Sequence, residues 1–128
     1  MYRVAKQLPE SEKFGLAGQI RRAAVSLTNN IAEGHGRYHY LDQIKFTLQS
    51  RGSLEELIDD LNVCADEDYL PIEETSSLKE QGWRVRKLID YIRYLRDQKN
   101  SRGFPSVQEP SPAYDDADEL DDDSRISI

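Results

Sequence analysis

The stretch QIRRAAVSLTNNIAEGHGR, residues 19–37, decides the fold. Its apolar residues recur at steps of three and four, which places them on one face of an α-helix. Together with Leu16, three positions before the stretch begins, the apolar stripe comprises Leu16, Ile20, Ala23, Ala24, Leu27 and Ile31. Pro9 precedes the stripe and Gly34 follows it. We therefore expect a helix over residues 10–33, with Gly34 as its left-handed C-terminal cap.

Two more helices follow from the same kind of pattern. In residues 38–65, mostly apolar residues recur at alternating steps of four and three and form a seam along one face of a helix. Residues 72–99 show a similar pattern. Short connections between helices of similar length predict antiparallel neighbours. Residues 1–8 form only a stub. The fold class predicted is all-α, an antiparallel up-down four-helix bundle over residues 1–99 with a truncated first helix.

Charge separates the body of the chain from its end. The net charge of the 128 residues is −7, and residues 101–128 hold two basic against eight acidic residues. This end also holds three prolines and few large apolar residues. Such a composition cannot offset the entropy of ordering, so we predict a disordered acidic tail over residues 100–128. The tail would act as a solubilising appendage, or fold back on the last helix and compete with nucleic acid.

Several classes of protein are disfavoured. No apolar run is long enough to span a bilayer, and MYRVAKQLPES lacks the apolar core of a signal peptide. We therefore expect a cytoplasmic protein with no membrane partner. The single cysteine, Cys64, lies in a helical pattern, and we expect it to be a buried apolar residue.

The residues that carry chemistry form no recognisable constellation. His35 and His39 are four apart, but no third ligand is evident, so we predict no metal site. No glycine-rich phosphate loop and no Ser/His/Asp arrangement can be argued. We therefore expect no catalytic residue, no cofactor, no small-molecule substrate and no enzymatic activity.

The sequence resembles that of a known family. FGLAGQIRRAAVSLTNNIAEGHGR followed by RGSLEELIDDLNV is similar to the bacterial 23S rRNA intervening-sequence proteins, with the motifs QIRRAAVS, NIAEG and GSLxEL in order. The likeness extends from about Tyr2 to Leu95. It implies a four-helix bundle that assembles into a homopentamer and has no established catalytic activity. Members lie within intervening sequences of large-subunit rRNA genes, and relatives are accessory proteins of diversity-generating retroelements.

The chain departs from the pattern of this family at both ends. Members usually carry a full first helix before the Leu-Pro turn, whereas eight residues precede Pro9 here. Either Met1 is not the true start, or the bundle exposes the apolar seam of its other three helices. The acidic tail is a second departure.

The side of the helix at residues 10–33 opposite its apolar stripe is small and polar. A solvated face would normally be filled with Lys and Glu. We therefore predict that this face packs against a neighbouring subunit or the missing first helix, although it could be an ordinary exposed face. The subunit-interface candidates are Gly18, Arg22, Val25, Ser26, Asn29 and Glu33.

Arg51 interrupts the otherwise apolar seam of residues 38–65. A buried guanidinium needs a paired carboxylate to offset its desolvation. Glu55, one turn on, and Glu33, from the helix before, are the candidates for a buried ion pair. The alternative is that Arg51 extends to solvent.

The last helix is rich in basic residues. Arg86–Asp90 and Arg93–Asp97 have the spacing of ion pairs on a solvated face. The alternative is a surface that binds RNA or DNA. Its candidate residues are Arg84, Arg86, Lys87, Arg93 and Arg96. The leading hypothesis is a non-enzymatic, self-assembling scaffold or accessory factor whose partner is itself, and the second is a nucleic-acid-binding module.

Overall fold

The computed structural model describes residues 1–102. This part of the chain is helical and contains no strand, which confirms the all-α class. Its elements are α1 (Tyr2–Gln7), the 3₁₀ turn η1 (Glu10–Glu12), α2 (Leu16–Gly36), α3 (Tyr40–Asp66) and α4 (Ile72–Ser101). The ends of α3 and α4 lie within two residues of those predicted. Most of the predicted tail, from residue 103 on, lies outside the described residues.

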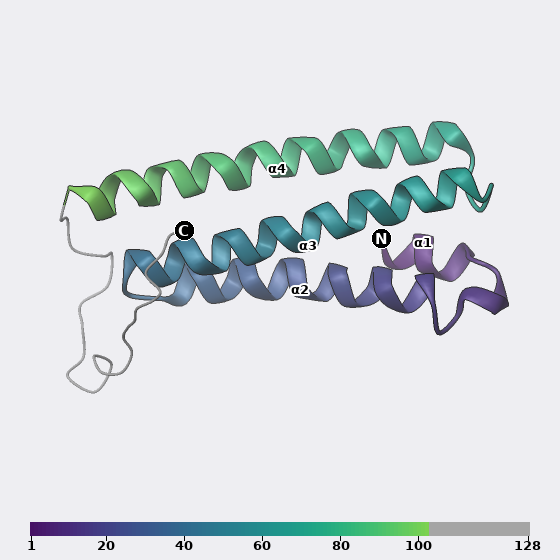
Figure 1. The fold of residues 1–128 in the computed structure, drawn as a ribbon, viewed down its shortest axis with the longest axis horizontal. Coiled ribbons are helices and arrows are strands. Elements are labelled where there is room, and N and C mark those ends of the chain that lie inside the picture. Colours follow the sequence, from purple (N-terminus) through teal and green to yellow (C-terminus); the bar gives the residue numbers. More distant parts are fainter. Residues whose placement is uncertain (103–128) are drawn as a thin grey trace.

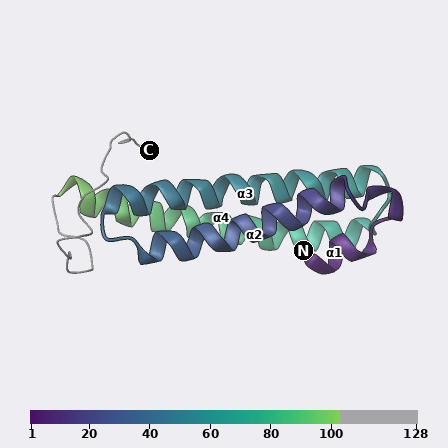
Figure 2. The same cartoon turned by 90° about the horizontal axis from the view of Figure 1, so that it is seen from below.

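Three long helices form the body of the molecule. Figure 1 shows α2, α3 and α4 side by side, with the chain reversing direction at each connection. Helix α3 packs against both α2 and α4. Figure 2 shows α3 along one side of the molecule and the short α1 on the opposite side, at one end. Because α1 is so short, it covers only that end of the groove between α2 and α4.

The core is uneven along the length of the molecule. At the end covered by α1, one apolar cluster joins all the helices and includes Val4, Leu8, Leu16, Ile20, Leu57, Leu61 and Cys64. Towards the other end, the buried cluster shrinks to Leu54, Ile58 and Ile89. Farther along, α3 buries polar side chains, namely Gln43, Thr47 and Ser50. The bundle is therefore well filled at one end and open at the other.

Helix α2 begins at Leu16, so the predicted start at residue 10 is wrong. Residues 10–12 form the 3₁₀ turn, and Gly15 leaves the helical conformation with φ −101° and ψ −107°. The side chain of Glu12 takes the place of a cap, since its Oε1 accepts a hydrogen bond from the Leu16 N–H at 3.1 Å. An accepting carboxylate is favourable here because the N–H groups of the first turn lack partners within the helix.

Glu12 also ties the start of α2 to the connection between α3 and α4. Tyr69 donates a hydrogen bond from its hydroxyl to Oε2 of Glu12 at 2.8 Å. The turn before Tyr69 is sharp, with Asp68 in the left-handed region at φ 58°. The two hydrogen bonds lower the pKa of Glu12, and the bond to Glu12 raises the pKa of Tyr69.

Gly34 is not the C-terminal cap, which corrects the second prediction made for this helix. Helix α2 continues to Gly36, and Gly34 is buried within it. A Cβ at Gly34 would lie 3.1 Å from Cβ of Phe46 and 3.3 Å from Nη1 of Arg96. Glycine is therefore needed here for the close approach of α3 and for the space that Arg96 occupies.

Replacing Gly34 by Ala should lower the free energy of unfolding. The crowding against Phe46 should cost about 1–3 kcal/mol, which outweighs the roughly 1 kcal/mol that Ala gains over Gly in a helix. The matched control is Gly52→Ala in α3, where nothing lies within 4 Å of the added Cβ. That change should stabilise the protein by about 0.5–1 kcal/mol. Urea unfolding compares the two, and equal stabilisation by both would contradict this role of Gly34.

The contribution of Glu12 should depend on pH. Because its pKa is lowered in the folded protein, its stabilisation is present above the ordinary pKa of 4.5 and is lost as the pH falls through the lowered folded value. Wild type should therefore unfold at a higher urea concentration than Glu12→Gln at pH 7, and the difference should shrink towards pH 3. The control is Glu10→Gln, which removes an exposed carboxylate 3.8 Å from Lys13. A difference that stays constant with pH would contradict the assignment.

Candidate functional site

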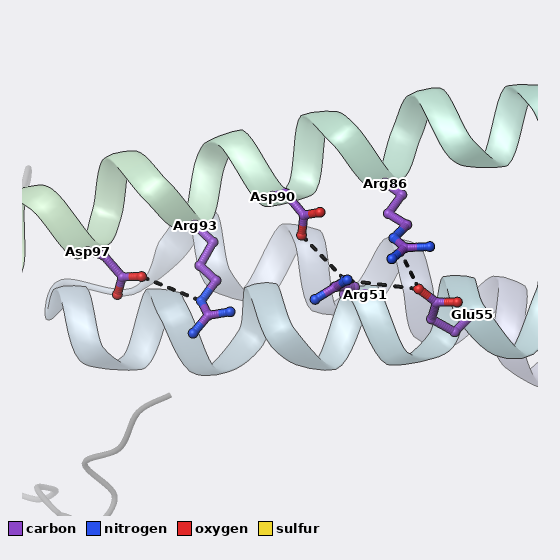
Figure 3. Close-up of polar contacts among 6 residues, drawn as sticks. All are labelled: Arg51, Glu55, Arg86, Asp90, Arg93 and Asp97. Carbon is purple, nitrogen blue, oxygen red and sulfur yellow. Dashed lines mark ion pairs between the residues drawn. The ribbon is translucent and has the colours of Figure 1, made fainter.

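Ion pairs join α3 to α4 along the middle of the bundle. Arg51 Nε lies 3.4 Å from Asp90 and 4.0 Å from Glu55, and Arg86 Nε lies 3.2 Å from Glu55. Figure 3 shows these side chains meeting between the two helices. All four are partly exposed, so each pair should contribute no more than about 1 kcal/mol. Their clear effect is to fix which charges of α4 point towards α3.

Arg51 is only partly buried, with its side chain 31% exposed, so it lies between the predicted buried ion pair and the alternative of a side chain that extends to solvent. Glu55 is one neighbour, but the nearer carboxylate is that of Asp90, which the sequence did not single out for Arg51. Glu33 lies elsewhere and pairs with Arg37 at 2.9 Å. Arg51 therefore has two carboxylate neighbours at the edge of the α3–α4 contact.

Two other arginines of α4 also point towards α3. Arg93 Nε lies 3.4 Å from Asp97 (Figure 3), although the buried Nε makes no hydrogen bond within residues 1–102. Arg96 donates from Nη1 to the Gln43 carbonyl at 3.2 Å and to the Thr47 hydroxyl at 2.6 Å. Burial lowers the pKa of Arg96. The guanidinium group of Arg96 is therefore engaged inside the bundle, whereas that of Arg93 is 38% exposed and pairs within its own helix.

This arrangement leaves a face of α4 that carries cations and no acid. Between residues 82 and 102 the acids are Asp90 and Asp97, and Figure 3 shows both on the side towards α3. On the side of α4 that points away from α3, roughly 80–100° around the helix from these two acids, steps of three and four residues bring together one set of side chains. This outer face of α4 consists of Arg84, Lys87, Tyr91, Tyr94, Gln98 and Arg102. Tyr91 and Tyr94 are 59% and 57% exposed.

The five nucleic-acid candidates are thus divided between two sides of α4. Arg86, Arg93 and Arg96 face α3, although the side chains of Arg86 and Arg93 remain 39% and 38% exposed. The five candidates therefore do not form one surface, which corrects the sequence prediction. Arg84 and Lys87 are on the outer face of α4. A helical wheel of the last helix would have separated the two sets.

A groove opens between α2 and α4 at the end away from α1. It has a volume of about 380 Å³ and is lined by Ile31, Thr47, Ser50, Ile89, Ile92 and Arg96. Two of the apolar side chains that line it remain accessible, with Ile31 46% and Ile92 39% exposed. Leu88 and Leu95, one turn of α4 to either side of Ile92, are 61% and 39% exposed. We call Ile31, Leu88, Ile92 and Leu95 the apolar strip. At the other end α1 buries Val4 and Leu8 in the core, whereas no described element covers this end.

The predicted interface residues of α2 are also divided. Ser26 is turned towards α3, where its hydroxyl accepts a hydrogen bond from Ser53 at 2.7 Å, so its placement on the outward side is wrong. Glu33 is exposed but engaged by Arg37. The other four candidates, Gly18, Arg22, Val25 and Asn29, lie on the side of α2 away from the core, where Gly18 lies beside the side chain of Arg22. We call Gly18, Arg22, Val25 and Asn29 the outer face of α2.

A comparison with known families identifies this architecture. The family model described as 23S rRNA-intervening sequence protein matches residues 1–91. The chain belongs to this family. The resemblance read from the motifs is therefore confirmed, and the match covers all of α1, α2 and α3 and most of α4. A comparison with curated proteins finds no match.

The family match does not reach the whole of the outer face of α4. It ends at Tyr91, before Tyr94, Gln98 and Arg102. The acidic segment of the chain also lies beyond the match. These features therefore have to be interpreted from their own chemistry.

Groups that could support catalysis do not gather in the described part of the chain. Residues 1–102 contain no group of three or more His, Cys, Asp or Glu that could hold a metal ion. Cys64 is completely buried, and burial raises its pKa, which disfavours the reactive thiolate. No helix within these residues has the length and apolar character needed to cross a membrane. The surfaces best suited to a function are thus the two outer faces and the apolar strip.

Proposed function

We propose that this protein is a non-enzymatic up-down helical bundle that assembles into a homopentamer and acts as a scaffold or accessory factor. The observation that carries the proposal is the apolar strip beside the open groove. Contiguous exposed apolar surface on a soluble domain marks a contact site. Covering a side chain such as Leu88 contributes up to about 1.5–3 kcal/mol. The pentameric state is what membership of the family suggests.

A closed ring places a requirement on the surface of each copy. Each subunit must offer two different, complementary surfaces, because the contact runs head to tail. The apolar strip is one such surface and the outer face of α2 is the other. The second surface has small and polar side chains around Val25, which allow a neighbouring helix to come close. We therefore propose that the strip of one copy meets the outer face of α2 of the next.

Light scattering coupled to size-exclusion chromatography tests this arrangement. Wild type should elute at about 74 kDa, five times the 14.8-kDa chain. The double change Leu88→Glu and Leu95→Glu, or the single change Val25→Glu, should give monomers. Ile72→Glu is the matched control, since Ile72 is as exposed as Leu88 (61%) but lies at the first residue of α4.

Mixing the two kinds of monomer gives a sharper result. Each retains one intact surface, so a head-to-tail contact should yield a one-to-one dimer of about 30 kDa. Circular dichroism should show unchanged helix content in every variant. A wild-type monomer at micromolar concentration would refute self-assembly. Monomers that fail to pair on mixing would refute the head-to-tail contact.

A second candidate function is the binding of single-stranded nucleic acid. The outer face of α4 favours it, because cations that neutralise phosphates alternate there with exposed tyrosines on which bases can stack. The acids that would oppose phosphate, Asp90 and Asp97, lie to the side of this face and point towards α3. The proposed binding surface is therefore the outer face of α4, in place of the five basic residues selected from the sequence.

Fluorescence anisotropy with a labelled single-stranded RNA tests this candidate. Arg84→Gln with Lys87→Gln should weaken binding, and the slope of log K against log salt should become shallower by about 0.7 for each phosphate that the protein no longer neutralises. Arg86→Gln with Arg93→Gln removes the same number of charges from the side facing α3, and should leave binding nearly unchanged. Equal losses of affinity from both pairs would show that net charge, not this face, determines binding.

A further inference from the structure

The outer face of α4 has an excess of positive charge that the described residues do not neutralise. Three of the seven Lys and Arg of residues 82–102 lie on this face, namely Arg84, Lys87 and Arg102, and neither of the two Asp in that range does. Both Asp lie within 4 Å of arginines at the α3–α4 contact. Arg84 and Lys87 form no ion pair with any carboxylate of residues 1–102. The surplus charge therefore lies where an acidic partner can reach it.

The same chain supplies an acidic segment in the sequence that follows this helix. Residues 115–123, DDADELDDD, hold seven acids in nine positions. Residues 103–128 as a whole contain one Arg and eight acids. The segment is thus complementary in charge to the outer face of α4 and begins thirteen residues after Arg102, at the end of that face.

We infer that residues 115–123 bind the outer face of α4 of their own chain. The length of the intervening chain permits this contact. Eighteen helical residues separate Arg84 from Arg102, a distance of about 27 Å. Thirteen residues of extended, proline-containing chain reach up to about 40 Å. Tethering so close to the target gives an effective concentration in the millimolar range, so even weak attraction suffices.

The proposed contact should be weak and sensitive to salt, because its charged groups are exposed to solvent. A single exposed ion pair contributes less than about 1 kcal/mol, so occupancy depends on several charges acting together. At about 1 M salt the screening length falls to roughly 3 Å, and the acidic segment should dissociate from the helix. This association does not require that the protein bind nucleic acid, although both would use the same face.

Paramagnetic broadening in the full-length protein tests the inference. A nitroxide is attached at Ser124→Cys, which can be labelled selectively because Cys64 is completely buried. At low salt, amide signals of residues 84–102 should lose intensity, and at 1 M salt they should recover. Recovery should also follow Arg84→Gln with Lys87→Gln, but not the matched pair Arg86→Gln with Arg93→Gln. Replacing the seven acids by Asn and Gln should likewise restore the signals.

Three results would overturn the inference. The first is that, at low salt, the amide signals of residues 84–102 show no broadening, or that broadening is spread evenly over all the helices. The second is broadening of an unlabelled, isotope-enriched chain mixed with spin-labelled chains, which would place the acidic segment on a neighbour. The third is a combination of two observations. Arg84→Gln with Lys87→Gln abolishes RNA binding, but the amides of the outer face of α4 in the wild-type protein show no broadening from the nitroxide. That result would assign the outer face of α4 to nucleic acid alone.

Discussion

The structure depends on the burial of α3 between α2 and α4. Helix α3 presents apolar residues to both neighbours, and small residues on those neighbours let them approach. Gly34 of α2 makes room for Phe46 and Arg96, while a Cβ at Gly82 of α4 would meet Ile58 at 3.4 Å. Because α3 lies to one side, α2 and α4 leave a groove on the other. Within residues 1–102, α1 covers one end of this groove and no element covers the other.

The contact between α3 and α4 also determines the charge of the surface. Arg51 and Glu55 of α3 attract Asp90 and Arg86 of α4 into the contact. Asp97 lies on the same side of α4, beside Arg93 of its own helix. What remains outward is a face of cations and tyrosines. One packing arrangement thus produces both candidate surfaces, the apolar strip beside the groove and the basic outer face of α4.

Features set by periodicity within one helix could be predicted from the sequence. The stripe from Leu16 to Leu27 is buried or partly buried as expected, because a helix wheel alone decides it. Ile31 fits the same stripe but is half exposed, since its burial depends on an element that does not reach it. Gly34 has the sequence of a helix cap, but its role comes from contacts with α3 and α4. Asp90 was missed as a partner of Arg51 because their proximity depends on the register between helices.

The proposed self-association would account for the apolar strip on the surface of the bundle. A crystal structure of the assembled protein is the most direct test. It should show Ile31 and Leu88 of one copy buried against Val25 and Asn29 of the next, with the contact repeated around a ring. An assembly in which this strip faces solvent, or which forms through another surface, would contradict the account.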